Sequence, residues 1–412
     1  MEQQNKIKIT VAFLTTTDPN NKRSFSGTHY YMLHTLKKIF HEVVPLGPVK
    51  LSNSIKWIEY LKVILTFARG KRYNRNHSEL RAKFYSKIFQ KQLNDKKIDL
   101  IIAAAASPSI SYLNTDIPII HVTDATFQLM VGYYEAFSNL SKSSVIESDK
   151  IELRSIKNST LSIYSSGWAA KSAINYYGKE KDKVFQIPYG VNTNKIPDRE
   201  LIYLKASNKT CKLLFLGVNW KRKGGDIAFA TLMELLQMPL ATELTICGCR
   251  PPKNVKNKQL HVIPYLDKNF ESDHDAFSKL MLDTNFIILP TRADCTPMAF
   301  PEAAAYGIPV ITTYTGGVPD IIENNVNGFC LPYQATPKEY CDIIFAIFSD
   351  KTRYNSLITS SRNKYEEQLN WNAWGKRIKQ LYETEIKSCE DPDELVQMPN
   401  VFLSFESKMS LE

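Results

Sequence analysis

The chain is long, basic and moderately apolar. It has 412 residues with a formal net charge of +10 at pH 7, and 43% of its residues are hydrophobic. This length exceeds one typical domain, and the charge favours acidic partners such as nucleotides, lipid-linked phosphates, anionic lipid headgroups or nucleic acid. No run of eighteen apolar residues occurs, and the polar start lacks the apolar core of a signal peptide. We therefore expect a cytoplasmic protein, soluble or peripheral to a membrane.

The seven cysteines all lie in the second half of the chain and show no paired metal-ligand spacing. This pattern indicates reduced thiols rather than disulfides or a metal site. Cys247 and Cys249 form a CxC pair, which is a weak metal signal and more typical of a strand end.

The chain begins with a β-rich run at residues 7–16, a polar loop, and a helix-like segment at 28–40 with apolar residues on one face. Gly27 stands where the loop meets this helix. A glycine at such a point lets the backbone approach a phosphate or sugar closely, although a plain β–α turn also accepts one.

Residues 55–72 predict a basic amphipathic helix. Such a stretch can lie in an anionic membrane interface. The interpretation that we favour from the sequence packs the apolar stripe on the sheet and leaves the charges in solvent. The stripe consists of Ile55, Ile58, Leu61, Leu65 and Phe67, and the basic cluster at the end consists of Arg69, Lys71 and Arg72.

Residues 116–134 predict a strand that runs into a loop carrying His121 and Asp124. An isolated histidine at a strand end is usually structural, but histidine is also the side chain that most readily changes charge near neutral pH. Both roles stay open for His121 on these grounds.

A second strand and turn place two cations together. Residues 212–217 predict a strand, and a Gly-Gly turn then leads into an amphipathic helix, so Arg222 and Lys223 follow the carboxyl end of the strand. Ligands of open α/β sheets bind at these ends, where two cations would neutralise a nucleoside diphosphate. By composition alone, a Lys-Arg-Lys triplet is more often an exposed turn whose lysines contribute little to folding.

The most informative stretch is 290–332, where Asp294 and Glu302 stand eight positions apart around a predicted helix start. Residues 286–289 predict a buried strand just before it, and Thr296-Pro297 combines a good N-cap residue with the residue favoured at the first helical position. Amides at a helix start form an anion site, and carboxylates accept hydrogen bonds from ribose and sugar hydroxyls.

Pro301 constrains this helix further. A proline fits only the first turn without losing a hydrogen bond, so the helix is expected to start near Met298 if Pro301 is to be accommodated.

This stretch resembles the donor-site signature of retaining GT-B glycosyltransferases of family four, the glycosyl transferases group 1. In that family two glutamates are separated by seven residues and a Gly-Gly turn follows, which is Gly316-Gly317 here. Asp294 takes the place of the first glutamate, and Pro297 takes the place of the usual small glycine.

The cationic turn is similar to the lysine–glycine element of the same family, in which an arginine and a lysine hold the donor diphosphate. Lys223 before Gly224 matches directly. Val218 stands where the arginine is usual, so the resemblance assigns that work to Arg222. The amino-terminal half of these enzymes is also similar in local sequence to four parts of this chain. These are the segments around Gly27 and His121 and the ranges 161–178 and 184–192.

The resemblance implies an α/β GT-B fold with two doubly wound Rossmann-like domains facing across a cleft. We place an amino-terminal, acceptor-side domain at 1–191 and a linker at 192–210. A nucleotide-sugar-binding domain follows at 211–368, then a helix at 369–386 that packs back on the first domain. An irregular tail occupies 388–412.

The implied activity is a retaining, hexosyltransferase-like transfer from a nucleotide sugar to a glycan, lipid-linked or other hydroxyl acceptor, without a metal or other cofactor. Possible contact with an anionic membrane is retained among the partners, and nucleic acid is not expected. The catalytic residues would be His121, Asp294, Arg222 and Lys223. The donor-binding residues would be Gly27, Tyr265, Thr296, Pro297, Met298, Ala299 and Glu302.

Two alternatives from other classes stay open. A GT-B sugar-nucleotide epimerase would convert the nucleotide sugar without releasing nucleoside diphosphate. A non-catalytic GT-B protein would bind the nucleotide without turnover.

Overall fold

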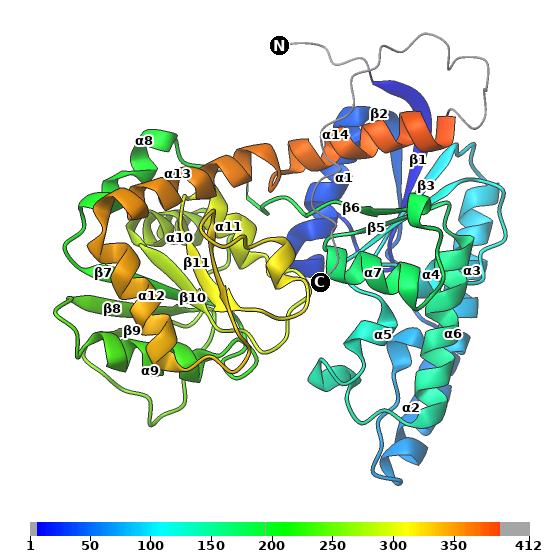
Figure 1. Cartoon of the computed structure of the whole chain (residues 1–412). Coiled ribbons are helices and arrows are strands. Elements are labelled where there is room, and N and C mark those ends of the chain that lie inside the picture. Colours follow the sequence, from blue (N-terminus) through cyan, green and yellow to red (C-terminus); the bar gives the residue numbers. More distant parts are fainter. Residues whose placement is uncertain (1–5, 194, 388–412) are drawn as a thin grey trace.

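The structure is a computed structural model that describes residues 6–193 and 195–387. The chain folds into two α/β domains, each built on a six-stranded sheet whose strands all run parallel (Figure 1). The α/β fold class predicted from the sequence is confirmed. The predicted tail and Cys389 lie outside the described residues.

The first sheet has the order β2-β1-β3-β4-β5-β6. Side chains alternate across it, so that Val11 and Phe13 of β1 enter one core while Ala12 and Leu14 enter the other. The strands are β1 (Ile7–Leu14), β2 (Phe40–Leu46), β3 (Leu100–Ala104), β4 (Ile119–Thr123), β5 (Leu161–Tyr164) and β6 (Val184–Gln186). The helices are α1 (Thr28–Ile39), α2 (Asn53–Phe67), α3 (Glu79–Asn94), α4 (Ser107–Ile110), α5 (Phe127–Met130), α6 (Lys142–Asn158) and α7 (Gly167–Asn175).

The second sheet has the order β12-β11-β10-β7-β8-β9. Because β7 and β10 are neighbours, the loops at their carboxyl ends lie side by side although about seventy residues separate them. The strands are β7 (Cys211–Leu216), β8 (Thr242–Cys247), β9 (Leu260–Ile263), β10 (Phe286–Leu289), β11 (Val310–Thr313) and β12 (Gly328–Leu331). The helices are α8 (Arg199–Ile202), α9 (Gly225–Leu235), α10 (Glu271–Asp283), α11 (Ala299–Ala305), α12 (Pro337–Ser349) and α13 (Lys351–Glu367).

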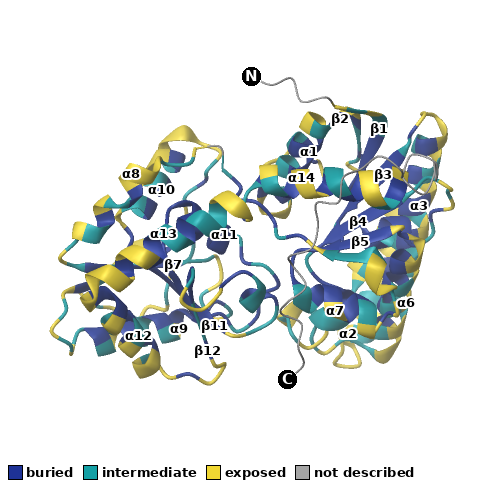
Figure 2. Cartoon of the chain, turned by 45° about the horizontal axis from the view of Figure 1, so that its top comes forward, coloured by how far each residue is buried: buried dark blue, intermediate teal, exposed yellow. Residues whose placement is uncertain are grey.

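Both sheets are covered by helices on their two faces, so the inner strands β3, β4, β5, β10 and β11 are buried at every position (Figure 2). The edge strands β2, β6 and β9 are partly exposed. Strand β10, FIIL, is buried at every position. Short 3-10 helices occur at Ser24–Gly27, Arg75–His77, Glu135–Phe137, Lys181–Lys183, Leu204–Ser207 and Val318–Asp320.

The chain crosses between the domains twice. The segment before β7 docks on the second domain, where Ile202 is fully buried and Lys205 donates to the carbonyl of Tyr306 at 2.7 Å. Helix α14 (Trp371–Tyr382) and the π-helical turn Glu383–Lys387 return to the first domain. Trp374 is fully buried there in the core that α1 also lines.

Helix α2 corrects one interpretation from the sequence, because its apolar residues do not pack on the sheet. Successive residues turn by 100°, so Ile55 points inward while Leu61, Leu65 and Phe67 point outward, with Phe67 79% exposed. The inward side carries Glu59, whose carboxylate accepts from Arg81 and from the Ser78 hydroxyl. A buried ion pair, rather than an apolar stripe, therefore attaches α2 to the domain.

Candidate functional site

A cavity of about 510 Å³ lies between the two domains, at the carboxyl ends of β7 and β10 and the start of α1. Ten of the eleven residues predicted for the site line this cavity. They are Gly27, Arg222, Lys223, Tyr265, Asp294, Thr296, Pro297, Met298, Ala299 and Glu302. The structure thus brings together residues from both halves of the chain, and His121 is the exception.

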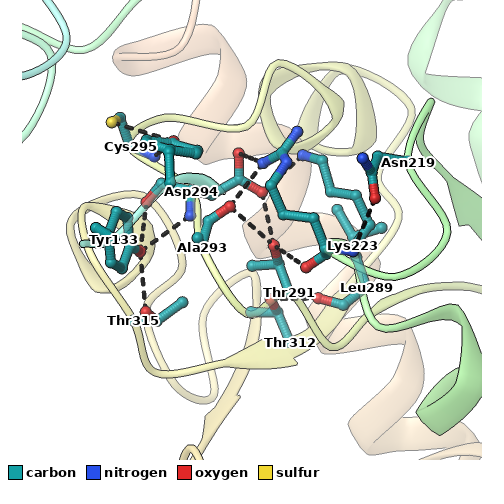
Figure 3. Close-up of polar contacts among 12 residues, drawn as sticks. Tyr133, Asn219, Lys223, Leu289, Thr291, Ala293, Asp294, Cys295, Thr312 and Thr315 are labelled. Atoms are coloured by element: carbon teal, nitrogen blue, oxygen red, sulfur yellow. Dashed lines mark hydrogen bonds and ion pairs between the residues drawn. The ribbon is translucent and has the colours of Figure 1, made fainter. Parts of the chain in front are cut away.

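Asp294 is the centre of a compact ionic cluster in this cavity (Figure 3). Its carboxylate accepts from Lys223 Nζ at 2.6 Å, from Arg222 Nη1 at 3.2 Å and from Thr291 Oγ1 at 2.8 Å. Arg222 Nη1 also donates to the carbonyl of Ala293 at 2.6 Å. Both carboxylate oxygens are occupied, so Asp294 orients the two cations in the absence of a ligand.

Lys223 is buried, and the prediction of an exposed turn is wrong for this residue. The turn is pulled in by Gly224, which adopts a φ of +75° and approaches the carbonyl of Pro290 so closely that a Cβ would lie 1.9 Å from its oxygen. Only glycine meets both requirements. The ammonium group therefore sits beneath the turn against Asp294 rather than in solvent.

Glu302 is the second carboxylate of the cavity, and it forms an ion pair with Lys268. Glu302 is only 5% exposed. Lys268 comes from the loop after β9 and was not predicted, because nothing in its local sequence marks it and 34 residues separate it from Glu302. The Asp294 cluster and the Glu302–Lys268 pair line one cavity, which therefore contains three cations and two carboxylates.

Helix α11 begins at Ala299 with Met298 as its N-cap, as the position of Pro301 indicated, so the prediction of Thr296 as N-cap is wrong. The Thr296 hydroxyl instead forms a hydrogen bond with Ser165 of the first domain. Because α11 has only seven residues, its dipole is short. The side-chain cations are therefore the main positive charges of the cavity.

Two tyrosines of the first domain hold the Asp294 loop across the cleft. The hydroxyl of Tyr133 accepts from the Asp294 N–H at 2.9 Å and also contacts Thr315 Oγ1 at 2.9 Å. The hydroxyl of Tyr134 accepts from the Cys295 N–H at 2.9 Å, and the Tyr134 ring lies 5.5 Å from the Arg222 guanidinium. Sequence reasoning did not find these residues, since 161 positions separate each from its partner.

Gly27 caps helix α1 with a φ of +88°. A Cβ there would lie 3.0 Å from the carbonyl oxygen of Lys22, so the loop closes tightly against the helix start. Asn192 also ties this turn to the interdomain segment by donating to the carbonyl of Ser26 at 2.8 Å.

The structure does not bring His121 to the cavity. It lies inside β4, is fully buried, and contacts Ser107 Oγ at 3.3 Å through Nε2. Burial lowers its pKa to about 4, so the imidazole is neutral at physiological pH. Asp124, three residues further along, lies beyond the carboxyl end of β4. Burial, with a smaller contribution from the charge of Asp294, raises its pKa to about 6.

Within the ranges that the structure describes, no three His, Cys, Asp or Glu side chains gather in a way that could hold a metal ion. The six described cysteines are free thiols, and Cys247 lines the cavity at the end of β8.

Residues 210–350, which contain the cationic turn and both carboxylates, match the family model described as Glycosyl transferases group 1. This part of the chain is therefore similar to that family. The group 1 segment covers most of the second domain and both charged clusters of the cavity.

Curated relatives extend the similarity beyond this segment. Spore coat protein SA of Bacillus subtilis is 26% identical over 185 residues, or 42% of this chain and 48% of the relative. The putative colanic acid biosynthesis glycosyltransferase WcaL of Salmonella typhimurium is 24% identical over 229 residues, or 53% of this chain and 54% of the relative. The chain therefore spans about half the length of these relatives.

The fold is GT-B, the arrangement seen in solved glycosyltransferase structures. The structure titled Anabaena Alr3699/HepE in complex with UDP and glucose has a TM-score of 0.60 and 13% identity to this chain. The similarity covers 91% of this chain and 100% of that one.

Proposed function

We propose that this protein is a glycosyltransferase that takes its donor, a nucleotide sugar, in the interdomain cavity. The observation that carries the proposal is the buried Lys223–Asp294–Arg222 cluster at the carboxyl ends of β7 and β10. Fixed cations at this edge of a parallel sheet are suited to a diphosphate whose negative charge grows as it leaves.

Arg222 and Lys223 hold the donor diphosphate in this proposal. A lysine ammonium has three donors and a guanidinium has five, so both can keep Asp294 and still donate to phosphate oxygens. Asp294 then fixes the orientation of the two cations. Its carboxylate accepts a hydrogen bond from a sugar hydroxyl only where that hydroxyl replaces one of its present donors. This preorganisation is supported by the short Lys223–Asp294 distance of 2.6 Å.

Glu302 and Lys268 bind the nucleoside in this proposal. The Glu302 carboxylate has further lone pairs beyond the one that faces Lys268, and these accept from the two ribose hydroxyls. Tyr265, which is 60% exposed at the cavity wall, is placed to stack on the base.

The transfer is proposed to retain the configuration of the sugar. The bond between the anomeric carbon and the diphosphate oxygen breaks, and the departing oxygen takes the proton of the acceptor hydroxyl on the same face as the new bond forms. Gly27 lets the loop before α1 approach the sugar. His121 is given no role at the reacting centre, because it has no exposed surface.

The acceptor is proposed to be a glycan, lipid-linked or other hydroxyl compound, and the reaction to need no metal. The donor proposal draws support from the similarity to a protein whose structure was determined with UDP and glucose.

Screening UDP, GDP, ADP and dTDP sugars for binding and slow hydrolysis, with and without a chelator, tests the proposal. We expect one nucleoside class to bind and to release nucleoside diphosphate slowly, with no loss of rate in chelator. An epimerase would change the sugar without releasing nucleoside diphosphate. A non-catalytic protein would bind without turnover, and either result would refute the transferase assignment.

A further inference from the structure

Helix α2 presents an apolar face to solvent that nothing in the described chain covers. Seven large side chains of this helix are exposed, and the most exposed are Trp57 at 65%, Leu65 at 62% and Phe67 at 79%. The face is continuous, because positions 57, 60, 61, 64 and 65 repeat at the spacing of one helix side. The 15-residue helix is about 22 Å long, so the face is much larger than a scattered surface residue.

The charge around this face is mostly positive. Residues 53–75 contain six basic side chains and one acidic side chain, Glu59, which is buried against Arg81. Two of the six basic groups are paired, Lys62 with Glu147 and Arg72 with Glu135. In the part of the chain that the structure describes, the other four form no ion pair, and they are Lys56, Arg69, Lys71 and Arg75.

We infer that α2 docks on an anionic lipid surface and inserts its apolar face among the headgroups and upper acyl chains. A protein partner or a second copy would need a complementary apolar patch, but nothing in the structure identifies one. An apolar strip bordered by unpaired cations complements a surface that is acidic at its headgroups and apolar just below them. No helix in the described ranges is long and apolar enough to cross a membrane, so the contact is interfacial.

The contacts of α2 connect this surface to the cavity. The turn after α2 is held to residues 135–140, because Asn139 Nδ2 donates to the carbonyl of Gly70 at 2.8 Å and Arg72 Nη1 donates to the carbonyl of Glu135 at 2.5 Å. Tyr133 and Tyr134, at the start of the same loop, hold the Asp294 loop. Figure 1 shows α2 at the end of the first domain away from α14.

This inference rests on the proposed function in one respect, since it assigns a membrane-borne acceptor to the transferase. Docking through α2 would hold the enzyme at the membrane, where it would meet an acceptor hydroxyl compound carried on a lipid. Lipid binding itself is independent of the donor chemistry, so the two can fail separately.

The test is sedimentation of the full chain with vesicles of phosphatidylcholine alone or with about one third phosphatidylglycerol. We expect binding to the anionic vesicles only, with release as salt rises from about 0.1 M to about 1 M. Trp57 emission should shift to the blue on binding, and Trp57→Phe should remove that shift. Leu65→Asp should weaken vesicle binding roughly tenfold or more, since it removes an inserted leucine and adds a negative charge.

Leu204→Asp is the matched control, because Leu204 is 67% exposed on the second domain. It should bind vesicles like the wild type. Nucleotide binding and slow donor hydrolysis without lipid should be the same in wild type, Leu65→Asp and Leu204→Asp. A wild type that neither binds nor hydrolyses any nucleotide sugar would refute the proposed function. Vesicle binding by the same protein would still support α2 as the lipid-binding surface.

Three results would overturn the inference. One is a wild-type chain that binds neither kind of vesicle, and another is equal loss of binding in Leu65→Asp and Leu204→Asp. The third is a wild-type dimer in analytical ultracentrifugation that Leu65→Asp converts to a monomer, which would show that a second copy covers the face.

Discussion

Replacing Lys223 with methionine should destabilise the fold and impair donor use together. Lys223 is 8% exposed and donates to Asp294 Oδ2 at 2.6 Å. Methionine keeps most of the side-chain length but removes the charge, so the Asp294 carboxylate loses its shortest partner. The sequence had indicated an exposed lysine whose removal leaves stability unchanged, and the buried ion pair reverses that expectation.

The loss of stability in Lys223→Met depends on which hydrogen-bond donors remain around the Asp294 carboxylate. Breaking a buried ion pair by removing one partner typically costs about 3–5 kcal/mol. Arg222 at 3.2 Å and Thr291 at 2.8 Å still bond the carboxylate, so its charge is not left alone. We therefore expect a loss of about 2–3 kcal/mol, which is the scale of one hydrogen bond to a charged group.

Urea unfolding of the full chain measures this loss, and a double-mutant cycle isolates the pair. Lys223→Met combined with Asp294→Asn should cost less than the sum of the two single changes, by about 1–3 kcal/mol. Lys221→Met is the matched control, because Lys221 is an exposed lysine of the same turn, and it should change stability by less than about 0.5 kcal/mol.

Donor hydrolysis gives the second measurement. Turnover of the donor that the wild type accepts should fall about a hundredfold or more in Lys223→Met, since one fixed charge at the departing diphosphate is lost. If the Lys221 and Lys223 variants were equally stable and the double-mutant cycle showed no coupling to Asp294, the Lys223–Asp294 pair would not stabilise the fold. Wild-type turnover at saturating donor would remove Lys223 from the diphosphate site.

Three further predictions follow from other contacts of the cavity. Glu302→Gln should weaken nucleoside diphosphate binding about tenfold and lower activity with it, because the amide keeps one good acceptor for the ribose hydroxyls; unchanged affinity in calorimetry would exclude the ribose role. Tyr133→Phe should cost about 1–3 kcal/mol in urea unfolding, since the Asp294 N–H loses its partner, and an unchanged midpoint would contradict that contact. Asp124 has a folded pKa of about 6, above its ordinary 3.8, so its contribution to stability falls as pH rises from 3.8 to 6. Asp124→Asn should therefore be more stable than the wild type above about pH 6, by up to about 3 kcal/mol, and this difference should vanish near pH 4. A difference in the free energy of unfolding that stays constant across this pH range would contradict the raised pKa of Asp124.

Local sequence predicted several of the strands and helices and most of the residues that line the cavity. Strand β10 matches its predicted residues 286–289, because a short apolar run bounded by polar residues has few other structures in an α/β domain. The order of strand, turn and helix also placed Arg222 and Lys223 at a carboxyl end, since a strand that feeds a helix leaves its turn at one edge of the sheet.

Tertiary structure decided which charges meet and which faces are covered. The pairing of β7 with β10 sets Lys223 against Asp294, and no local pattern encodes the distance between two loops 71 residues apart. Period-two alternation says that His121 points to one side of β4, but helices cover both sides of this sheet, so only the packed structure shows that it is buried away from the cleft. Likewise, the apolar residues of α2 were evident in the sequence, while their exposure depends on Glu59 and Arg81, which turn the polar side of that helix inward.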